Sequence, residues 1–191
     1  MKKITSLYKI KDMALKSKRA VYSIQQLSNL ISKPKSIAKV YSSRLVNKEI
    51  AKRLLQGKIT FIDDDQIIAS QLIEPSYISL RSALLFHSMI KQVPQNIECV
   101  TPRNSRFHKE LGIAYHKIPP ALFFGYDRLQ KGDSYIFMAD PEKALIDSVY
   151  LNKISKSMIP EIAENIDKNK LTKYIKRFKG RGKKKLERWL L

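Results

Sequence analysis

The chain of 191 residues is long enough for one domain or two small ones, and with 43% hydrophobic residues it can build a core. It has 37 lysines and arginines against 17 aspartates and glutamates, and the resulting net charge of +20 favours polyanionic partners such as nucleic acid. A single cysteine, Cys99, excludes an intramolecular disulfide framework, and with only three histidines no zinc-binding spacing is available.

No N-terminal apolar run resembles a signal peptide. No stretch approaches the roughly 18 to 20 uninterrupted apolar residues that a membrane span needs. We therefore expect a cytoplasmic protein without a membrane partner. We expect no cofactor.

The positive charge lies at the two ends of the chain. Residues 1–62 hold 15 basic and 2 acidic side chains, residues 63–167 hold 11 and 14, and residues 168–191 hold 11 and 1. A polyanion is therefore expected to contact the ends of the chain rather than its middle.

Three helices are predicted in the first 47 residues. An apolar stripe predicts the first helix over residues 3–16, formed by Ile4, Leu7, Tyr8, Ala14 and Leu15. Ser23 is the expected N-cap of the second, which has Ile24, Leu27, Leu30 and Ile31 at helical spacing. Pro34 suits the first turn of the third helix, which runs to about Asn47.

The third helix has the pattern of a recognition helix for the major groove of DNA. Its expected buried face carries Ile37, Val40, Tyr41 and Leu45. The opposite face is short, polar and basic, with Lys35, Ser36, Lys39, Ser42 and Ser43, and we expect it to contact base edges.

A hairpin follows the third helix. Two β-leaning runs flank Gln56 and Gly57, and a basic hairpin after three helices is typical of the wing of a winged helix-turn-helix. We expect phosphate contacts from Lys33, Lys52, Arg53 and Lys58. The alternative for each of these cations is an ordinary solvated face.

The middle of the chain begins with Asp63, Asp64 and Asp65, which lack the ligand spacing of a calcium loop and predict a solvated linker turn. A helix is expected from Tyr77 onward, with Ser79 as its N-cap. Ser82 and His87 on this helix could suggest a hydrolase, but the Gly-x-Ser-x-Gly and Ser-x-x-Lys motifs are missing. We expect His87 to be a structural histidine.

From Val93 onward short β-like segments alternate with Pro and Gly, and Gln130–Asp133 predicts a hairpin turn. A helix then starts with Asp140 as N-cap, Pro141 at its first position and Glu142 in its first turn. Asp140, Glu142 and Lys143 also invite comparison with metal-dependent nucleases. Because Glu142 and Lys143 are adjacent rather than alternate on a strand, we expect a helix cap, no metal site and no catalytic residue.

The C-terminal segment contains two amphipathic stretches, around residues 158–166 and 171–178, and then a lysine run ahead of Trp189. The lysines could add phosphate contacts, or they could form a charged surface turn before a docking helix. We expect Trp189 to be buried.

These patterns predict an α+β protein. A winged helix-turn-helix domain over residues 1–65 is followed by a mixed α/β domain over residues 66–191, with a small sheet, flanking helices and basic C-terminal helices.

Four segments resemble the AbiEi-type antitoxins, the transcriptional regulators of type IV toxin–antitoxin systems. They are SQLIEPSYISLRSALLFHSMI (70–90), QVPQNIECVTPRNSR (92–106), HKIPPALFFGY (116–126) and MADPEKALIDSVYL (138–151). The resemblance implies a non-enzymatic repressor that binds double-stranded DNA at repeats in the operator of its own operon. It also implies a nucleotidyltransferase-like toxin as a possible partner, neutralised through the C-terminal domain. We expect the protein to bind such repeats as a homodimer or as two monomers.

Three alternatives to operator binding stay open at this point. The chain could be a toxin-neutralising interaction protein, an RNA-binding module without specific operator recognition, or an enzyme that uses one of the two side-chain groups named above.

Overall fold

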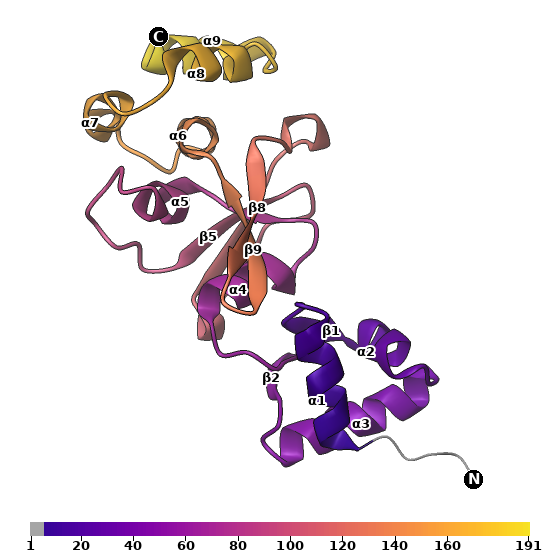
Figure 1. Cartoon of the computed structure of the whole chain (residues 1–191). Coiled ribbons are helices and arrows are strands. Elements are labelled where there is room, and N and C mark those ends of the chain that lie inside the picture. The colour runs from indigo at the N-terminus through magenta and orange to yellow at the C-terminus, as the bar shows by residue number, and fades with distance from the viewer. Residues whose placement is uncertain (1–5) are drawn as a thin grey trace. The chain divides into compact units, whose positions relative to one another are not determined.

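The computed structural model describes residues 6–191 and shows a mixed α and β chain with two separate sheets (Figure 1). The chain divides into two compact units. The first unit contains the segment up to Leu72 together with Gln130–Ile136, and the second contains Ile73–Leu129 and Phe137–Leu191. The first unit thus extends past residue 65 and takes in a distant segment.

The first unit holds three helices, a three-stranded sheet and a fourth short helix. Its elements are α1 (Leu7–Lys16), β1 (Val21–Ser23), α2 (Ile24–Ile31), α3 (Lys35–Asn47), β2 (Lys52–Leu55), β3 (Lys58–Thr60) and α4 (Asp65–Leu72). The sheet order is β1-β3-β2, with both pairs antiparallel. The predicted helices and hairpin are confirmed, whereas α4 was not expected.

Ser23 caps α2, as the sequence predicted, and Gln26 completes a capping box with it. The Ser23 hydroxyl accepts a hydrogen bond from the Gln26 backbone N–H at 3.2 Å. The Gln26 side chain in turn accepts one from the Ser23 N–H at 2.8 Å. Both groups satisfy backbone donors that the helix itself leaves without an acceptor.

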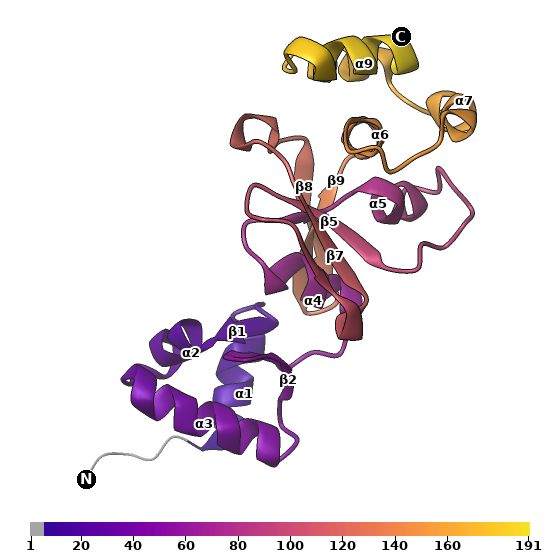
Figure 2. The same cartoon turned by 180° about the vertical axis from the view of Figure 1, so that it is seen from behind.

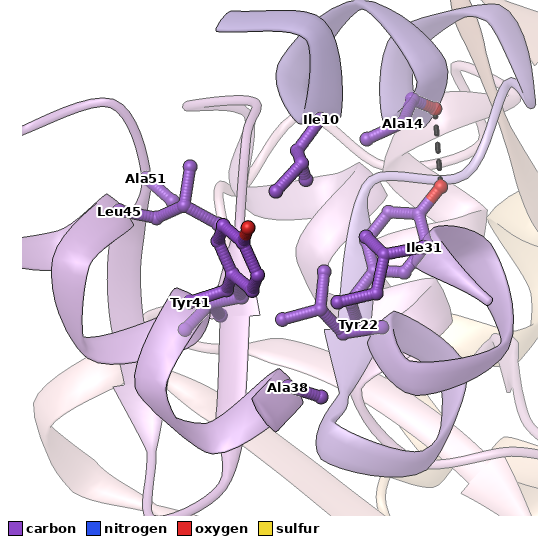
Figure 3. Close-up of a cluster of buried hydrophobic side chains, with 10 residues drawn as sticks. Ile10, Ala14, Tyr22, Ile31, Ala38, Tyr41, Leu45 and Ala51 are labelled. Carbon is purple, nitrogen blue, oxygen red and sulfur yellow. Dashed lines mark hydrogen bonds between the residues drawn. The ribbon is translucent and has the colours of Figure 1, made fainter. Parts of the chain in front are cut away.

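The core of the first unit forms where α1, α2 and α3 pack against one another (Figure 2). Figure 3 shows its side chains, which belong to Ile10, Ala14, Tyr22, Leu27, Ile31, Ala38, Tyr41, Leu45, Ala51 and Ile59. The Tyr22 hydroxyl donates to the Ala14 carbonyl at 3.1 Å. The predicted stripe of the first helix was wrong at Tyr8, which is 70% exposed, because Ile10 fills the core instead. Ile4 lies outside the described residues.

Gln71 joins three segments of the first unit. Its side-chain oxygen accepts from the Ala20 N–H at 2.8 Å, and its amide nitrogen donates to the Tyr135 carbonyl at 3.0 Å. The Ser134 hydroxyl donates to the Lys18 carbonyl at 2.7 Å. Residues 130–136 belong to the first unit through these buried contacts.

The predicted solvated turn was wrong at Asp64. Its carboxylate accepts from the Ile67 N–H at 3.0 Å and pairs with Lys131 at 2.9 Å. Asp64 therefore stabilises the start of α4 and its contact with the hairpin tip, which the local sequence alone could not reveal because Lys131 is distant in the chain.

The second unit is built on a six-stranded sheet of order β6-β7-β5-β4-β9-β8. The strands of this sheet are β4 (Tyr77–Ile78), β5 (Ile97–Thr101), β6 (Arg106–His108), β7 (Ile113–Lys117), β8 (Tyr126–Lys131) and β9 (Ser134–Ala139). The ends of β8 and β9 that lie within Gln130–Ile136 belong to the first unit. Two pairs are parallel, β4 with β9 and β5 with β7. The predicted turn at Gln130–Asp133 is confirmed, with Gly132 at a φ of +54°.

The helices of this unit are α5 (Leu80–Phe86), α6 (Pro141–Tyr150), α7 (Ile159–Ala163), α8 (Lys168–Ile175) and α9 (Gly180–Leu190). Short 3-10 turns cover Lys109–Leu111, Pro120–Leu122 and Lys156–Met158. Helices α5, α8 and α9 all pack against α6. Asp140 caps α6 as predicted, since its carboxylate accepts from the Lys143 N–H at 2.8 Å.

The expected helix from Tyr77 starts three residues later. Tyr77 and Ile78 are strand residues, paired with β5 and β9. Ser79 stands at the N-cap position, but its hydroxyl does not cap the helix. It donates instead to Asp147 Oδ2 at 2.9 Å.

Asp147 is the centre of a buried polar network. Lys143 is 0% exposed and Asp147 1%, and the Lys143 ammonium contacts Asp147 Oδ1. The hydroxyls of Tyr77 and Ser79 donate to Oδ2 at 3.0 and 2.9 Å. Burial raises the pKa of Asp147, against the opposing effects of Lys143 and the two hydroxyls. The network connects α6 to the start of α5 and to β4.

Removing one member of the buried pair is expected to be costly. Asp147→Leu leaves the Lys143 charge buried without a counter-ion and should lower the free energy of unfolding by about 3 to 5 kcal/mol. The double change Lys143→Met with Asp147→Leu should cost less, because no charge remains buried. Urea denaturation measures both.

Glu187→Ala is the matched control, because Lys183 and Glu187 have the same i, i+4 spacing on an exposed surface, at 3.7 Å. Its effect should stay below about 0.5 kcal/mol. Equal losses in Asp147→Leu and Glu187→Ala would contradict a structural role for the buried network.

Glu98 forms a second buried charge cluster in this unit. Arg81 Nε lies 3.6 Å and His116 Nε2 3.7 Å from its carboxylate oxygens. Burial alone would raise the pKa of Glu98, but its interactions with His116 and Arg81 outweigh burial and hold that pKa below the usual range. Ionised Glu98 therefore stabilises the folded chain.

The sign of the pH dependence follows from this lowered pKa. Glu98 makes its full contribution to the free energy of unfolding when the pH is above 4.5, the ordinary pKa of this carboxyl group. The contribution is lost as the pH falls through the lower pKa of the folded state. Glu98→Gln should therefore flatten the fall in urea midpoint below about pH 4.5. The same change at the exposed Glu161 is the control, and an unchanged pH profile in Glu98→Gln would contradict the assignment.

Candidate nucleic-acid interface

Four buried side chains fix the rotation of α3. Ala38, Tyr41, Ser42 and Leu45 face the core of the first unit. The predicted faces were therefore wrong at three positions. Ser42 is only 2% exposed, while Ile37 and Val40 are 42% and 46% exposed. Ala38, together with Tyr41 and Leu45, supplies the apolar contacts of the buried face.

The exposed face of α3 is polar, basic and partly aliphatic. At 3.6 residues per turn, Ser36, Val40, Ser43 and Asn47 follow its midline. Lys35 and Lys39 lie on one flank, and Ile37 and Arg44 on the other. Within residues 6–191, no carboxylate pairs with Lys35, Lys39 or Arg44. We call the solvent-facing residues 35, 36, 37, 39, 40, 43, 44 and 47 the α3 face.

A tight turn joins α2 to α3. Ser32 ends α2 in a left-handed conformation, and the Ser28 hydroxyl donates to the Lys33 carbonyl at 2.5 Å. The predicted phosphate contact Lys33 is half-buried in this turn, next to the start of α3. This turn therefore places a further cation beside the α3 face.

The β2–β3 hairpin carries three of the predicted cations in three different settings. Gly57 makes the turn at a φ of +74°, where a residue with a side chain would be strained. Arg53 is exposed, and Lys52 is exposed and pairs with Asp63 at 3.2 Å. The Lys58 ammonium donates to the Leu72 carbonyl at the end of α4. Lys58 therefore has a role within the first unit, which the sequence reasoning missed.

Ser82 and His87, the residues of the hydrolase alternative, have separate hydrogen-bond partners in the structure. The Ser82 hydroxyl accepts from the Glu98 N–H at 2.9 Å, and His87 Nε2 lies 2.8 Å from the Ala139 carbonyl oxygen. Both side chains are thus bonded to separate backbone groups.

The carboxylates at the start of α6 are also bonded within the fold. Lys170 bridges Asp140 at 3.1 Å and Glu142 at 2.9 Å, while Lys143 turns away to Asp147. In the part of the chain that the structure describes, no group of three or more His, Cys, Asp or Glu is placed to hold a metal ion.

The C-terminal lysine run is helical and does not form the surface turn that was one of its two predicted alternatives. Helix α9 begins at Gly180, and Leu186 is its fully buried residue. A side chain at Gly182 would come within 2.7 Å of the Tyr150 ring, so a glycine is needed where α9 approaches α6. Trp189 is half-buried, and its indole nitrogen is enclosed without a hydrogen-bond partner.

Several C-terminal cations remain exposed. Lys185 donates to Asn152 Oδ1 at 2.5 Å and Lys170 bridges the two carboxylates of α6. Eight others are exposed and have no carboxylate partner among the described residues: Lys168, Lys173, Lys176, Arg177, Lys179, Arg181, Lys184 and Arg188. We call these residues the second basic surface.

Comparison with known proteins adds no functional assignment. No protein-family model and no curated protein matches the chain. Over the described range, none of the helices is long and apolar enough to cross a membrane.

The different settings of Arg53 and Lys58 can be tested by stability measurements. Lys58→Ala removes a charged donor from the Leu72 carbonyl and should lower the free energy of unfolding by roughly 1 to 3 kcal/mol. Arg53→Ala in the same hairpin is the matched control and should change stability by less than about 0.5 kcal/mol. Thermal melting monitored by circular dichroism measures both, and an unaffected Lys58→Ala would contradict the internal role.

Proposed function

We propose that the chain is a DNA-binding transcriptional repressor whose first unit is a winged helix-turn-helix domain. In this proposal α3 is the recognition helix and the β2–β3 hairpin is the wing. The observation that carries it is the α3 face, where three cations without carboxylate partners surround short polar side chains.

The order of elements supports this proposal. A helix, a strand, two helices and a hairpin follow one another, and the hairpin pairs with the first strand in the order β1-β3-β2. A helix that is joined to its predecessor by a short turn and exposes one polar face fits the major groove of duplex DNA. The hairpin beside it can then reach the phosphate backbone.

The proposed contacts differ from the sequence prediction at two residues. Lys35, Ser36, Lys39 and Ser43 stay as the polar residues that face base edges, and Lys33, Lys52 and Arg53 stay as phosphate contacts. Ser42 is left out because it packs in the core. Lys58 is left out because its ammonium is bonded to Leu72.

We further propose that the protein represses its own operon as the antitoxin of a type IV toxin–antitoxin system. The support is the resemblance of residues 70–90, 92–106, 116–126 and 138–151 to AbiEi-type antitoxins. Most of these residues lie in the second unit, around the sheet and α6. A nucleotidyltransferase-like toxin would then bind this unit. We assign no catalytic step, because the candidate side chains serve as caps, ion pairs and backbone contacts.

The DNA-binding proposal is tested by reversing two charges on the α3 face. Lys35→Glu with Lys39→Glu should abolish binding to duplex DNA from upstream of the protein's own gene, because two attractive phosphate or base contacts become repulsive. Gel shift measures binding, and circular dichroism should show an unchanged fold, since both side chains are exposed.

The matched control is Lys91→Glu with Lys109→Glu, two exposed lysines of the second unit that give the same change in net charge. This variant should retain most of the binding. If Lys35→Glu with Lys39→Glu leaves binding intact while Arg181→Gln, Lys184→Gln and Arg188→Gln together remove it, the nucleic-acid contact belongs to the second basic surface. Such a result would favour the RNA-binding alternative and contradict the recognition-helix assignment.

A further inference from the structure

Two aliphatic side chains stand out among the polar residues of the α3 face. Ile37 is 42% and Val40 46% exposed, and both lie in the N-terminal half of the helix. They are three residues apart, so they are neighbours on the helix surface. The core of the first unit is complete without them, because Ala38, Tyr41 and Leu45 supply the apolar contacts of α3.

The charges around these side chains indicate what covers them. Lys35 and Lys39 lie on one flank of the helix and Arg44 lies on the flank that carries Ile37, and none of the three has a carboxylate partner in the described chain. A second copy of this chain docked through the same face would bring like charges together. Two half-exposed side chains also fall far short of the roughly 800 Å² per partner that a stable protein interface buries. An anionic partner that offers small apolar groups fits better.

We propose that Ile37 and Val40 contact the C5-methyl groups of thymines in the major groove, and that the operator therefore contains thymines at the positions facing them. This inference rests on the proposed DNA-binding function. Among the four bases, only thymine carries a methyl group on its major-groove edge. An apolar side chain can therefore distinguish thymine by contact with this group. Lys33, Lys52 and Arg53 would hold the helix on the phosphates, and Lys35, Lys39 and the serines would reach polar base atoms.

The side-chain types suit this contact. Isoleucine and valine are β-branched and have one strongly preferred rotamer in a helix, so little conformational entropy is lost when they meet a methyl group. Removing one methyl group from water contributes roughly a factor of four in affinity. Each of the two contacts should therefore change the dissociation constant by about threefold to fivefold.

The test replaces thymine by deoxyuridine, which pairs in the same way and lacks only the methyl group. The full chain first selects its preferred duplex from a randomised library, and single thymines of that duplex are then replaced. Wild-type protein should bind about threefold to fivefold more weakly at one or two of these thymines. Val40→Ala should no longer distinguish thymine from deoxyuridine at one of them, and Ile37→Ala should lose the distinction at another.

Val93→Ala is the matched control, because Val93 is a 74% exposed valine of the second unit. It should discriminate as wild type does. Selection of a duplex followed by equal affinity for thymine and deoxyuridine at every position would overturn the inference and leave the proposed function standing. Discrimination retained in both Val40→Ala and Ile37→Ala, or a change in their sedimentation without a change in discrimination, would also overturn it. If no duplex is selected at all, the proposed function fails as well.

Discussion

The rotation of α3 about its own axis decides which side chains of the first unit meet solvent. Ala38, Tyr41, Ser42 and Leu45 set this rotation by packing against α1, α2 and the sheet. Burial of these side chains supplies a free energy that no surface contact of the helix matches, since each apolar side chain contributes on the order of 1 to 3 kcal/mol. The composition of the α3 face is thus a consequence of core packing, and any contact with a partner has to use what that packing leaves exposed.

The sequence predicted the elements of the first unit better than their faces. Ser23, Pro34 and Gly57 are local signals, because each acts on backbone within a few residues, and they marked two helix starts and a turn correctly. The error on α3 has a physical origin. Two sets of apolar residues on α3 satisfy helical spacing. The first is 37, 40, 41 and 45, and the second is 38, 41 and 45. Only the shape of the surrounding core favours the second set. The set of DNA contacts inferred from the sequence stays a prediction, and it included two side chains that have roles inside the first unit, Ser42 in the core and Lys58 at Leu72.

In the second unit, the residues that could have signalled an enzyme have structural roles that depend on distant partners. Lys143 and Asp147 have the spacing of an ordinary surface pair, and nothing within α6 indicates that both are buried. Tyr77 and Ser79, about 70 residues earlier, complete the network. Asp140 and Glu142 likewise meet Lys170 from α8. Local sequence reasoning identified the helix cap, but it could not identify partners that only the sheet and the helix packing bring together.

The hairpin tip at residues 130–136 makes the first unit discontinuous in sequence. Ser134 and Tyr135 form hydrogen bonds with Gln71 and Lys18. In the described structure, no residue among the first 72 takes their place as partner in these bonds. A gene fragment cut after Leu72 would therefore encode a domain that lacks a segment of its own interior. A chimaera that transplants this domain onto another effector would have to transplant the tip with it, and an insertion or deletion in this turn would disturb a domain far away along the chain.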